Sequence, residues 1–200
     1  VKGLGREPTY VAEPKIDGVS VAVVYERGRL TRGATRGDGR VGEDVTANVR
    51  TIRAVPARLR TNTPPDWLEV RGEVFLRVVD FDRINEEQGA AGKPLFANPR
   101  NATAGLLRQK DPQVTGTRPL SVYFHGLVRI AGWHLESYTE TLAYLRDLGL
   151  RTHPEGKVCA TLDDVRAYIT DMEARRHALE HEIDGTVIKV DRHSDQNELG

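Results

Sequence analysis

The sequence predicts an α+β fold whose sheets are mostly antiparallel. Short runs of β-branched residues alternate with period two, a hairpin-type turn joins two of them, and helical stretches are interspersed without a regular βαβ order. Two hundred residues are enough for one or two domains with one sizeable core.

The predicted strands are the segments with period-two alternation. Val19 to Tyr25 alternates, and the turn in ERGRL, with Gly28 supplying a positive φ, predicts a hairpin that returns over Leu30 to Arg36. The later predicted strands are residues 67–76, a buried strand over 120–130, and residues 184–191.

The predicted helices are marked by capping residues and by apolar residues at helical spacing. Asn98 is the expected N-cap of one helix, with Pro99 as its first residue, and Thr161 with Asp164 forms a near capping box for another. The predicted helices are a short one over 44–55, 78–89 ending at Gly89 as C-cap, 98–109, 138–149 ended by Gly149, and 161–179.

The composition excludes several classes of protein. Lysine plus arginine equals aspartate plus glutamate, at 29 each, which argues against a stand-alone nucleic-acid clamp but leaves room for local basic patches. The single cysteine, Cys159, excludes an intramolecular disulfide and a thiolate-rich zinc site. With no signal-like start and no long apolar run, a soluble cytosolic protein is expected. The start at Val1 without methionine and the stop at NELG suggest a piece of a longer chain.

Lys15, in the stretch VAEPKIDGVS, is the first candidate for chemistry. Only about 0.04% of an ordinary lysine is neutral at pH 7, so a nucleophilic lysine needs its pKa lowered by about three units, a cost near 4 kcal/mol. In an extended segment Glu13, Lys15 and Asp17 share one face, and Gly18 removes the side chain where a ligand must approach. The alternative is a plain surface ion pair before a hairpin.

Two further charged residues interrupt apolar strands. Glu73 shares a strand face with Glu69 and Arg71, either as a functional polar stripe or as the solvated face of a half-buried strand. Lys189 must reach solvent or meet an anion, and the anion is favoured.

Basic and histidine-containing segments offer weaker signals. The glycines of residues 36–42, with Arg36, suit phosphate, although an ordinary hairpin loop and a cell-adhesion RGD at 36–38 are alternatives. Arg100 and Arg108 lie two helical turns apart and suit phosphates, unless they form a solvated face. His177 and His181 have the i, i+4 spacing of metal ligands but no HExxH pattern, so both are predicted to lie at the surface.

Taken together, several segments resemble the adenylation (nucleotidyltransferase) domain of bacterial NAD-dependent DNA ligases. They are EPKIDG, ATRGDGRVGEDVT, LEVRGEVFL, FANPRNATAGLLRQKDP and HEIDGTVIKVD, which stand in one order between Tyr10 and Gly200. Lys-x-Asp-Gly alone indicates the wider superfamily of ATP-dependent ligases and messenger-RNA capping enzymes. The motifs RGDGRVGEDVT and NPRNATAGLLRQ point to the NAD-dependent branch, and so does Val19 after Gly18. The resemblance implies an ATP-grasp-like ligase catalytic core with antiparallel sheets flanked by helices.

The resemblance implies catalytic roles for four residues. Lys15 would attack the α-phosphate of NAD and form lysyl-AMP, releasing nicotinamide mononucleotide. Lys189 would lie at the α-phosphate, lowering the pKa of Lys15 and neutralising the transition state. Asp17 and Asp184 would orient the lysine amine or bind Mg²⁺ through water, with no direct protein ligand of a metal assigned.

The resemblance also implies contacts to the nucleotide. Glu13 would meet the adenine ring, Arg36 the ribose side and Glu73 the ribose hydroxyls. His125 occupies the position where several relatives have a tyrosine stacked on adenine, and is a candidate for that stacking.

Further expectations concern the polynucleotide and the missing parts. Arg100 and Arg108 would handle nicked double-stranded DNA or the leaving mononucleotide, in a monomeric cytoplasmic enzyme of DNA replication and repair. Residues 1–200 would be an adenylation domain truncated at both ends, without the mononucleotide-binding, OB-fold, zinc, helix-hairpin-helix and BRCT parts, so the only zinc would belong to an absent part. This piece alone is therefore expected to adenylate itself from NAD poorly and to seal nicks poorly.

Two alternatives to an NAD-dependent DNA ligase remain. One is an ATP- or GTP-using RNA ligase or capping enzyme, and the other is a nick- or nucleotide-binding module without chemistry.

Overall fold

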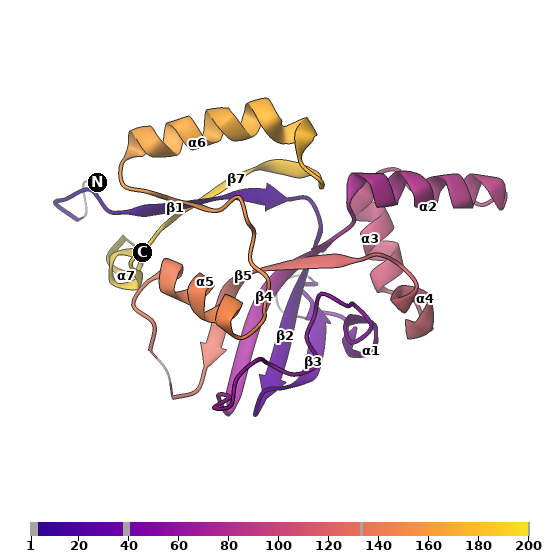
Figure 1. Ribbon diagram of the computed structural model, residues 1–200, viewed down its shortest axis with the longest axis horizontal. Helices are drawn as coiled ribbons and strands as arrows, with labels where there is room; N and C mark the ends of the chain where they lie inside the picture. The colour runs from indigo at the N-terminus through magenta and orange to yellow at the C-terminus, as the bar shows by residue number, and fades with distance from the viewer. Residues whose placement is uncertain (1–3, 38–40, 133, 200) are drawn as a thin grey trace.

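Two antiparallel sheets form the framework of the protein (Figure 1). The computed structural model describes residues 4–37, 41–132 and 134–199. One sheet has the strand order β6-β1-β7 and the other the order β3-β2-β4-β5, which confirms the predicted α+β class with antiparallel sheets. The strands are β1 (Tyr10–Ile16), β2 (Val19–Glu26), β3 (Arg29–Thr35), β4 (Trp67–Phe75), β5 (Ser121–Ile130), β6 (Lys157–Cys159) and β7 (Ile183–Val190).

Helices cover the sheets and extend beyond them. Helix α6 packs along the three-stranded sheet, α5 and α1 pack against the four-stranded sheet, and α2 projects to one side (Figure 1). The helices are α1 (Thr46–Val49), α2 (Val78–Ala90), α3 (Pro99–Leu107), α4 (Pro112–Gly116), α5 (Tyr138–Asp147), α6 (Leu162–Arg175), the 3₁₀ helix η1 (Arg176–Ala178) and α7 (His193–Leu199).

The local signals at several element ends are confirmed. The β2–β3 hairpin turns at Arg27 and Gly28, which have φ values of 47° and 75°, and two positive φ angles suit the right-handed twist of the paired strands. Gly149, with φ 84°, follows the end of α5. Asn98 caps α3 by accepting a hydrogen bond from the Asn101 N–H at 2.8 Å, and Thr161 begins α6 in a capping box.

The buried apolar residues form a larger core, a smaller core and a third cluster of Val11, Tyr138 and Leu142. The larger core joins β2, β3, β4 and β5 to the helices on one face of that sheet and includes Tyr25, Phe124 and Leu107. The smaller core lies between α6 and the three-stranded sheet and includes Tyr168 and Met172. Each sheet therefore has its own packed support, and the polar faces between the sheets are left to form a site.

Strand β1 pairs with the distant strand β7, and this pairing brings the two Ile-Asp-Gly segments together. Glu13 lies opposite Val187, and Val11 opposite Lys189. The register shifts between residues 14 and 16, after which the Asp17 N–H donates to the Glu182 carbonyl at 2.9 Å. The Ile-Asp-Gly sequence, which occurs at residues 16–18 and 183–185, thus marks two adjacent strand ends.

Some predicted boundaries are wrong. The segment 44–55 forms only the single turn α1, because its apolar side chains Val45, Ile52 and Val55 enter the core from irregular backbone. Helix α2 continues through Gly89 to Ala90, and it is Gly92 that has a positive φ of 65°. Strand β5 is the edge strand of its sheet and is buried only in its first half, where the Phe124 N–H donates to the Arg151 carbonyl at 2.7 Å.

Other departures involve short elements. Helix α6 ends at Arg175 and the 3₁₀ turn η1 follows, where one helix to residue 179 was expected. Strand β6 and helices α4 and α7 were not predicted, since each is too short to give a periodic pattern. Within the described ranges, none of the helices has both the length and the apolar character that crossing a membrane requires.

Candidate active site

A cavity of about 820 Å³ lies between the two sheets and collects nearly all of the predicted site residues. Its size is within the usual range for small-molecule sites. Strand β1, the start of β2, β4, β5, α3 and β7 all contribute to its wall. The predicted residues that line it are Glu13, Lys15, Arg36, Glu73, Arg100, Arg108, His125, Asp184 and Lys189.

Lys15 and Asp184 form an ion pair at the mouth of this cavity. The Lys15 Nζ donates to Asp184 Oδ2 at 2.6 Å, and both side chains are about half exposed, at 53% and 40%. The pairing of β1 with β7 places them together although 169 positions separate them in the chain. The lysine therefore faces the cavity with a carboxylate in direct contact.

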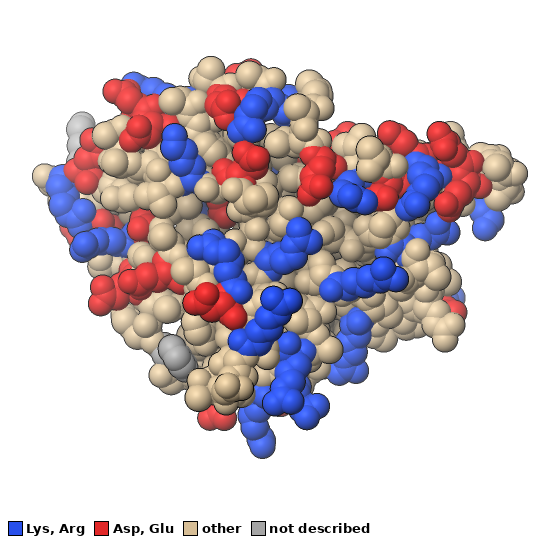
Figure 2. Space-filling view, viewed as in Figure 1, with Lys and Arg blue, Asp and Glu red and all other residues tan. Residues whose placement is uncertain are grey.

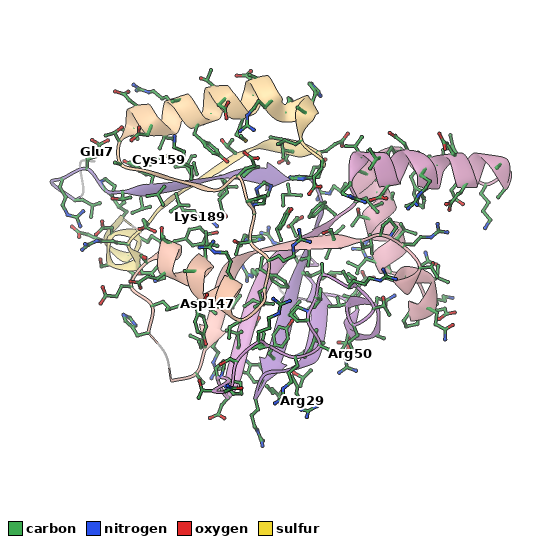
Figure 3. The ribbon with its side chains drawn as sticks, viewed as in Figure 1. Glu7, Arg29, Arg50, Asp147, Cys159 and Lys189 are labelled. Atoms are coloured by element: carbon green, nitrogen blue, oxygen red, sulfur yellow. The ribbon has the colours of Figure 1, made fainter. Side chains whose placement is uncertain are left out.

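Lys189 lies at the inner wall of the cavity, between the three-stranded sheet and α5 (Figure 3). Its ammonium donates to Glu13 Oε2 at 3.2 Å, to the His125 carbonyl at 3.1 Å and to the Tyr138 hydroxyl at 2.5 Å. The predicted meeting with an anion is confirmed, and that anion is Glu13. Burial lowers the pKa of Lys189, while Glu13 acts in the opposite direction.

Tyr138 completes this network and was missed by sequence reasoning. Its hydroxyl lies 2.6 Å from Glu13 Oε2 and from the His125 carbonyl oxygen, and its ring lies under the Lys189 ammonium at 3.9 Å. Burial, followed by the charge of Glu13, raises the pKa of Tyr138, so its hydroxyl stays a donor. A tyrosine opening an amphipathic helix was the available signal, because a buried phenol needs a polar partner.

Glu73 and His125 face each other across β4 and β5 without forming an ion pair at neutral pH. His125 Nε2 and Glu73 Oε2 are 3.9 Å apart. Burial raises the pKa of Glu73 to about 7, against the lowering effects of Arg100 and Lys15. Burial and then Lys189 lower the pKa of His125, so its imidazole is neutral at pH 7. The pair therefore offers a polar, weakly charged wall.

The remaining predicted residues surround the cavity. Arg100 Nη1 contacts Asp17 Oδ1 at 3.1 Å, and Arg108 Nε contacts Glu43 Oε2 at 2.5 Å. Asp17 reaches the site through Arg100 and is not itself part of the cavity wall. Arg36 and Gly37 line the cavity after the end of β3, while Asp38, the third residue of the RGD, lies outside the described residues.

Gly18 lines the cavity, as expected, and its close packing against β4 is a second reason for it to be glycine. A Cβ on Gly18 would lie 2.3 Å from the Val74 carbonyl oxygen and 3.0 Å from Glu73 Cγ. The closest neighbour of this position is therefore the backbone of β4. This approach brings the end of β1 down onto the strand that carries Glu73.

The prediction that His181 lies at the surface is wrong. The 3₁₀ turn after α6 breaks the i, i+4 geometry and directs the chain inward, so His177 stays exposed while His181 is buried against Phe75. His181 Nε2 lies 3.0 Å from His153 Nε2, and burial lowers the pKa of both imidazoles, that of His153 to about 3. Among the described residues, no three His, Cys, Asp or Glu side chains are grouped to hold a metal ion.

The structure is similar to that of a mycobacterial DNA ligase D complexed with ATP and MES, with a TM-score of 0.51 and 16% identity, over 92% of this chain and 48% of the other. At this identity the likeness shows a shared fold.

The chain belongs to the NAD-dependent DNA ligase adenylation domain family, whose model matches residues 2–200. It is 49% identical over 196 residues to a DNA ligase of Desulforamulus reducens, and 50% identical over 199 residues to one of Acetivibrio thermocellus. These matches cover 98% and 100% of this chain but 29% and 30% of the relatives. The chain therefore spans less than a third of the length of these relatives.

Proposed function

We propose that this chain is the adenylate-transferring core of an NAD-dependent DNA ligase, with Lys15 as its nucleophile. One observation carries the proposal: the β1–β7 pairing places Lys15, Asp184 and Lys189 on one cavity, in a chain of the NAD-dependent ligase family. The cavity has the volume of a nucleotide site, and its polar groups come from both sheets.

The first step joins AMP to the protein. The Lys15 amine attacks the α-phosphorus of NAD, a nitrogen–phosphorus bond forms, and the bond from phosphorus to the oxygen of nicotinamide mononucleotide breaks. The departing oxygen takes the bonding electron pair. Asp184, 2.6 Å from the Lys15 Nζ, orients the amine and receives the proton that it releases. Lys189 supplies positive charge as negative charge builds up around phosphorus.

The next steps return the lysine to its starting form. The 5′-phosphate of a DNA nick attacks the same phosphorus, the nitrogen–phosphorus bond breaks, and the Lys15 amine regains its proton. The 3′-hydroxyl across the nick then attacks the activated 5′-phosphate, which seals the strand and releases AMP. Arg100 and Arg108 bind phosphates of the nicked DNA or of the leaving mononucleotide, as their place in the cavity wall allows.

The nucleoside would be held by the walls of the cavity. Glu13, which is 4% exposed and held by Lys189 and Tyr138, presents a fixed acceptor edge to the adenine. Arg36 and Glu73 lie on the ribose side, and the neutral imidazole of His125 stacks on the base.

Asp17 and Asp184 are the carboxylates suited to hold Mg²⁺. Mg²⁺ commonly binds through one or two carboxylates and keeps several waters, so a site without three protein ligands fits this ion. Bound there, the ion would neutralise phosphate charge. Asp17 contacts Arg100 in the structure and would exchange that contact on binding, while Asp184 would keep its contact to Lys15 and meet the ion through water.

The proposal extends to the larger protein. Residues 1–200 would be one adenylation domain within a monomeric cytoplasmic ligase of replication and repair, with DNA and mononucleotide contacts completed by other segments. The share of the relatives that this chain covers, about 30%, supports that view. The chain alone is accordingly expected to react slowly with NAD.

Covalent labelling tests the proposal. The chain alone, and the chain completed with the remaining segments of the Acetivibrio thermocellus relative, are incubated with Mg²⁺ and with either NAD labelled in its AMP half or labelled ATP. Label bound to protein is expected from NAD, faster in the completed protein, and is expected to vanish in Lys15→Ala but not in the control Lys157→Ala, which changes an exposed lysine of β6. Labelling from ATP alone would favour the ATP-dependent relatives. Full labelling of Lys15→Ala would remove Lys15 from its role.

A further inference from the structure

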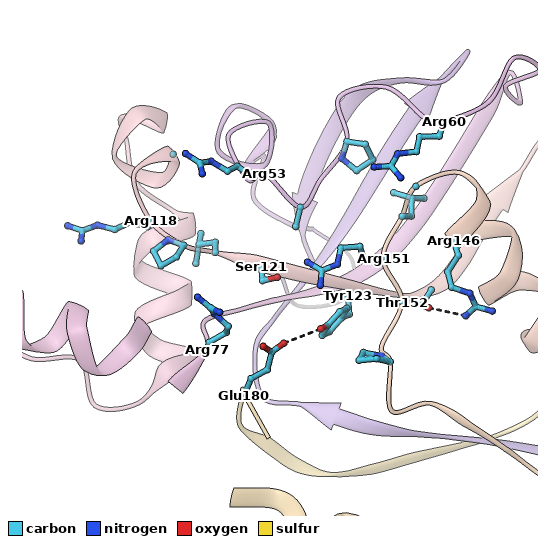
Figure 4. Close-up of a pocket in the computed structure, with 18 of the residues that line it drawn as sticks. Arg53, Arg60, Arg77, Arg118, Ser121, Tyr123, Arg146, Arg151, Thr152 and Glu180 are labelled. Carbon is cyan, nitrogen blue, oxygen red and sulfur yellow. Dashed lines mark hydrogen bonds between the residues drawn. The ribbon is translucent and has the colours of Figure 1, made fainter. Parts of the chain in front are cut away.

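A second hollow, outside the catalytic cavity, is lined mainly by arginine. This arginine groove has a volume of about 980 Å³ and runs between the turns around α1 and α4, the start of α2 and the segment after α5 (Figure 4). Among the described residues that line it, Glu180 is the one with an acidic side chain. The arginines are Arg53, Arg60, Arg77, Arg83, Arg118, Arg146 and Arg151.

The positive charge of the arginine groove is only partly neutralised. Asp80 pairs with two of its arginines, Glu87 pairs with a third, and Glu180 accepts a hydrogen bond from the Tyr123 hydroxyl at 3.2 Å. Seven guanidinium groups against these three carboxylates leave four positive charges. In the described part of the chain, the guanidinium groups without a carboxylate in contact include those of Arg53, Arg60 and Arg151.

This concentration of charge contrasts with the chain as a whole, whose formal net charge is zero. Figure 2 shows lysine and arginine side chains gathered in a band across the middle of one face, while acidic side chains lie mostly along its upper part. Local positive potential of this kind attracts polyanions even when the net charge of the protein is zero.

The chemistry of the arginine groove suits phosphodiesters. Its cationic groups are guanidinium groups, whose planar fork matches phosphate oxygens in a bidentate way. The aromatic ring in its described lining is that of Tyr123, which is 4% exposed and has the Arg151 guanidinium 5.5 Å from its centre. An unpaired strand needs exposed aromatic surfaces on which its bases stack, and this groove does not offer one. A strand whose bases are paired presents its phosphates and sugars on the outside and only the edges of its bases in the grooves.

The arginine groove is next to the catalytic cavity, because Tyr123 lines both. We propose that the arginine groove binds the phosphodiester backbone of duplex DNA beside the nick, as a second contact surface separate from the cavity that holds the adenylate. This inference rests on the proposed function, in which nicked DNA is the substrate. Arg53, Arg60 and Arg151 make the main contacts, because no carboxylate of the described chain competes for them.

Salt-dependent DNA binding tests the proposal. A fluorescent nicked duplex is titrated with the wild-type chain, with the triple variant Arg53→Gln, Arg60→Gln, Arg151→Gln, and with a matched triple control at arginines outside the groove, Arg27→Gln, Arg129→Gln, Arg166→Gln. The slope of log K against log salt is negative, and each lost phosphate contact reduces its magnitude by about one. The magnitude of the slope is therefore expected to be smaller by about three in the groove variant. Its affinity at low salt is expected to fall about tenfold or more, while the control stays close to wild type.

Two further measurements keep the outcomes separate. The single variant Arg53→Glu, at a guanidinium with no hydrogen bond or ion pair to another described side chain, is expected to reduce the steepness of the slope by at least about one if the triple variant fails to fold. The groove variants are expected to form the AMP adduct at the wild-type rate, so a failure of the adenylation proposal would appear as a missing adduct in the wild type. Equal losses in groove and control variants, or tighter binding of single-stranded than of duplex DNA, would overturn the duplex assignment.

Discussion

Lys189 and Glu13 form an ion pair across neighbouring strands, with 3.2 Å between Nζ and Oε2. The Glu13 side chain is 5% exposed, so its carboxylate is removed from water and depends on this lysine and on the Tyr138 hydroxyl. The strand register that sets this contact also places Lys15 and Asp184 at the mouth of the same cavity. The structural support of the site and its proposed chemistry therefore share one pair of strands.

Removing the Lys189 ammonium should destabilise the fold as well as stop adenylation. Lys189→Met keeps most of the side-chain volume but leaves Glu13 buried without its cation, and losing one partner of a buried pair costs on the order of 3 kcal/mol. Urea unfolding measures this loss. The double variant Lys189→Met, Glu13→Gln is expected to recover a large part of it, because no buried charge remains. A double variant less stable than Lys189→Met would contradict the assignment of the pair.

The Tyr138 hydroxyl should matter for both stability and nucleotide binding. Tyr138→Phe leaves Glu13 and the His125 carbonyl with one donor fewer, and a loss of about 1–3 kcal/mol is expected in the free energy of unfolding. Weaker binding of AMP should accompany it, measured by calorimetry. The control Tyr168→Phe removes a phenol hydroxyl that donates to the Glu155 carbonyl, away from the cavity, and should leave AMP binding unchanged. Equal effects of the two variants on AMP binding would rule out this role.

Glu73 should make stability fall as the pH rises. Its folded-state pKa of about 7 lies above the ordinary 4.5, so between these values the folded protein holds a proton that the unfolded chain has lost. The resulting penalty is absent below about pH 4.5, grows through pH 7 and reaches at most about 3 kcal/mol. Glu73→Gln removes it and should therefore stabilise the protein more at pH 8 than at pH 4.5. The control Glu69→Gln removes a carboxylate from the same strand face, and an identical pH dependence in both variants would refute the explanation.

Gly18 should tolerate no side chain. Gly18→Ala places a Cβ 2.3 Å from a backbone oxygen of β4, so the segment after β1 must move, at a cost of about 1–3 kcal/mol. The displacement separates Asp17 from Arg100 and slows adduct formation. Gly126→Ala, whose Cβ would make an ordinary 3.7 Å contact, is the matched control. Thermal unfolding and the rate of adduct formation are measured for both. A Gly18→Ala protein with the stability and rate of the control would show that the close approach has no importance.

The parts of the fold that local chemistry determines were predictable from the sequence. The β2–β3 hairpin follows from its turn glycine, and α3 and α6 follow from Asn98 and Thr161 as caps. Boundaries that tertiary contacts decide were not predictable. The segment 44–55 has helical spacing, yet its apolar residues fill the core as irregular backbone after one turn. The packing of these apolar side chains outweighs the weak intrinsic helix propensity of the segment.

Most of the residues that line the cavity could be predicted from the sequence, but the contacts between them could not. Residues with a motif position, such as Lys15 and Glu73, line one cavity as expected. The contacts of Tyr138 and the burial of His181 depend on where distant segments meet, so the local sequence does not specify them. The arginine groove likewise assembles from arginines spread between positions 53 and 151, so composition alone, with its zero net charge, concealed it.

Peptide mapping of the adduct tests the central claim most directly. The completed protein is treated with NAD and Mg²⁺ and digested under conditions that preserve phosphoramidates, and the peptide that carries the AMP-sized addition is sequenced by mass spectrometry. The addition is expected on the peptide containing Lys15, with none on the peptide containing Lys189. AMP found on any other lysine, with Lys15 unmodified, would contradict the account.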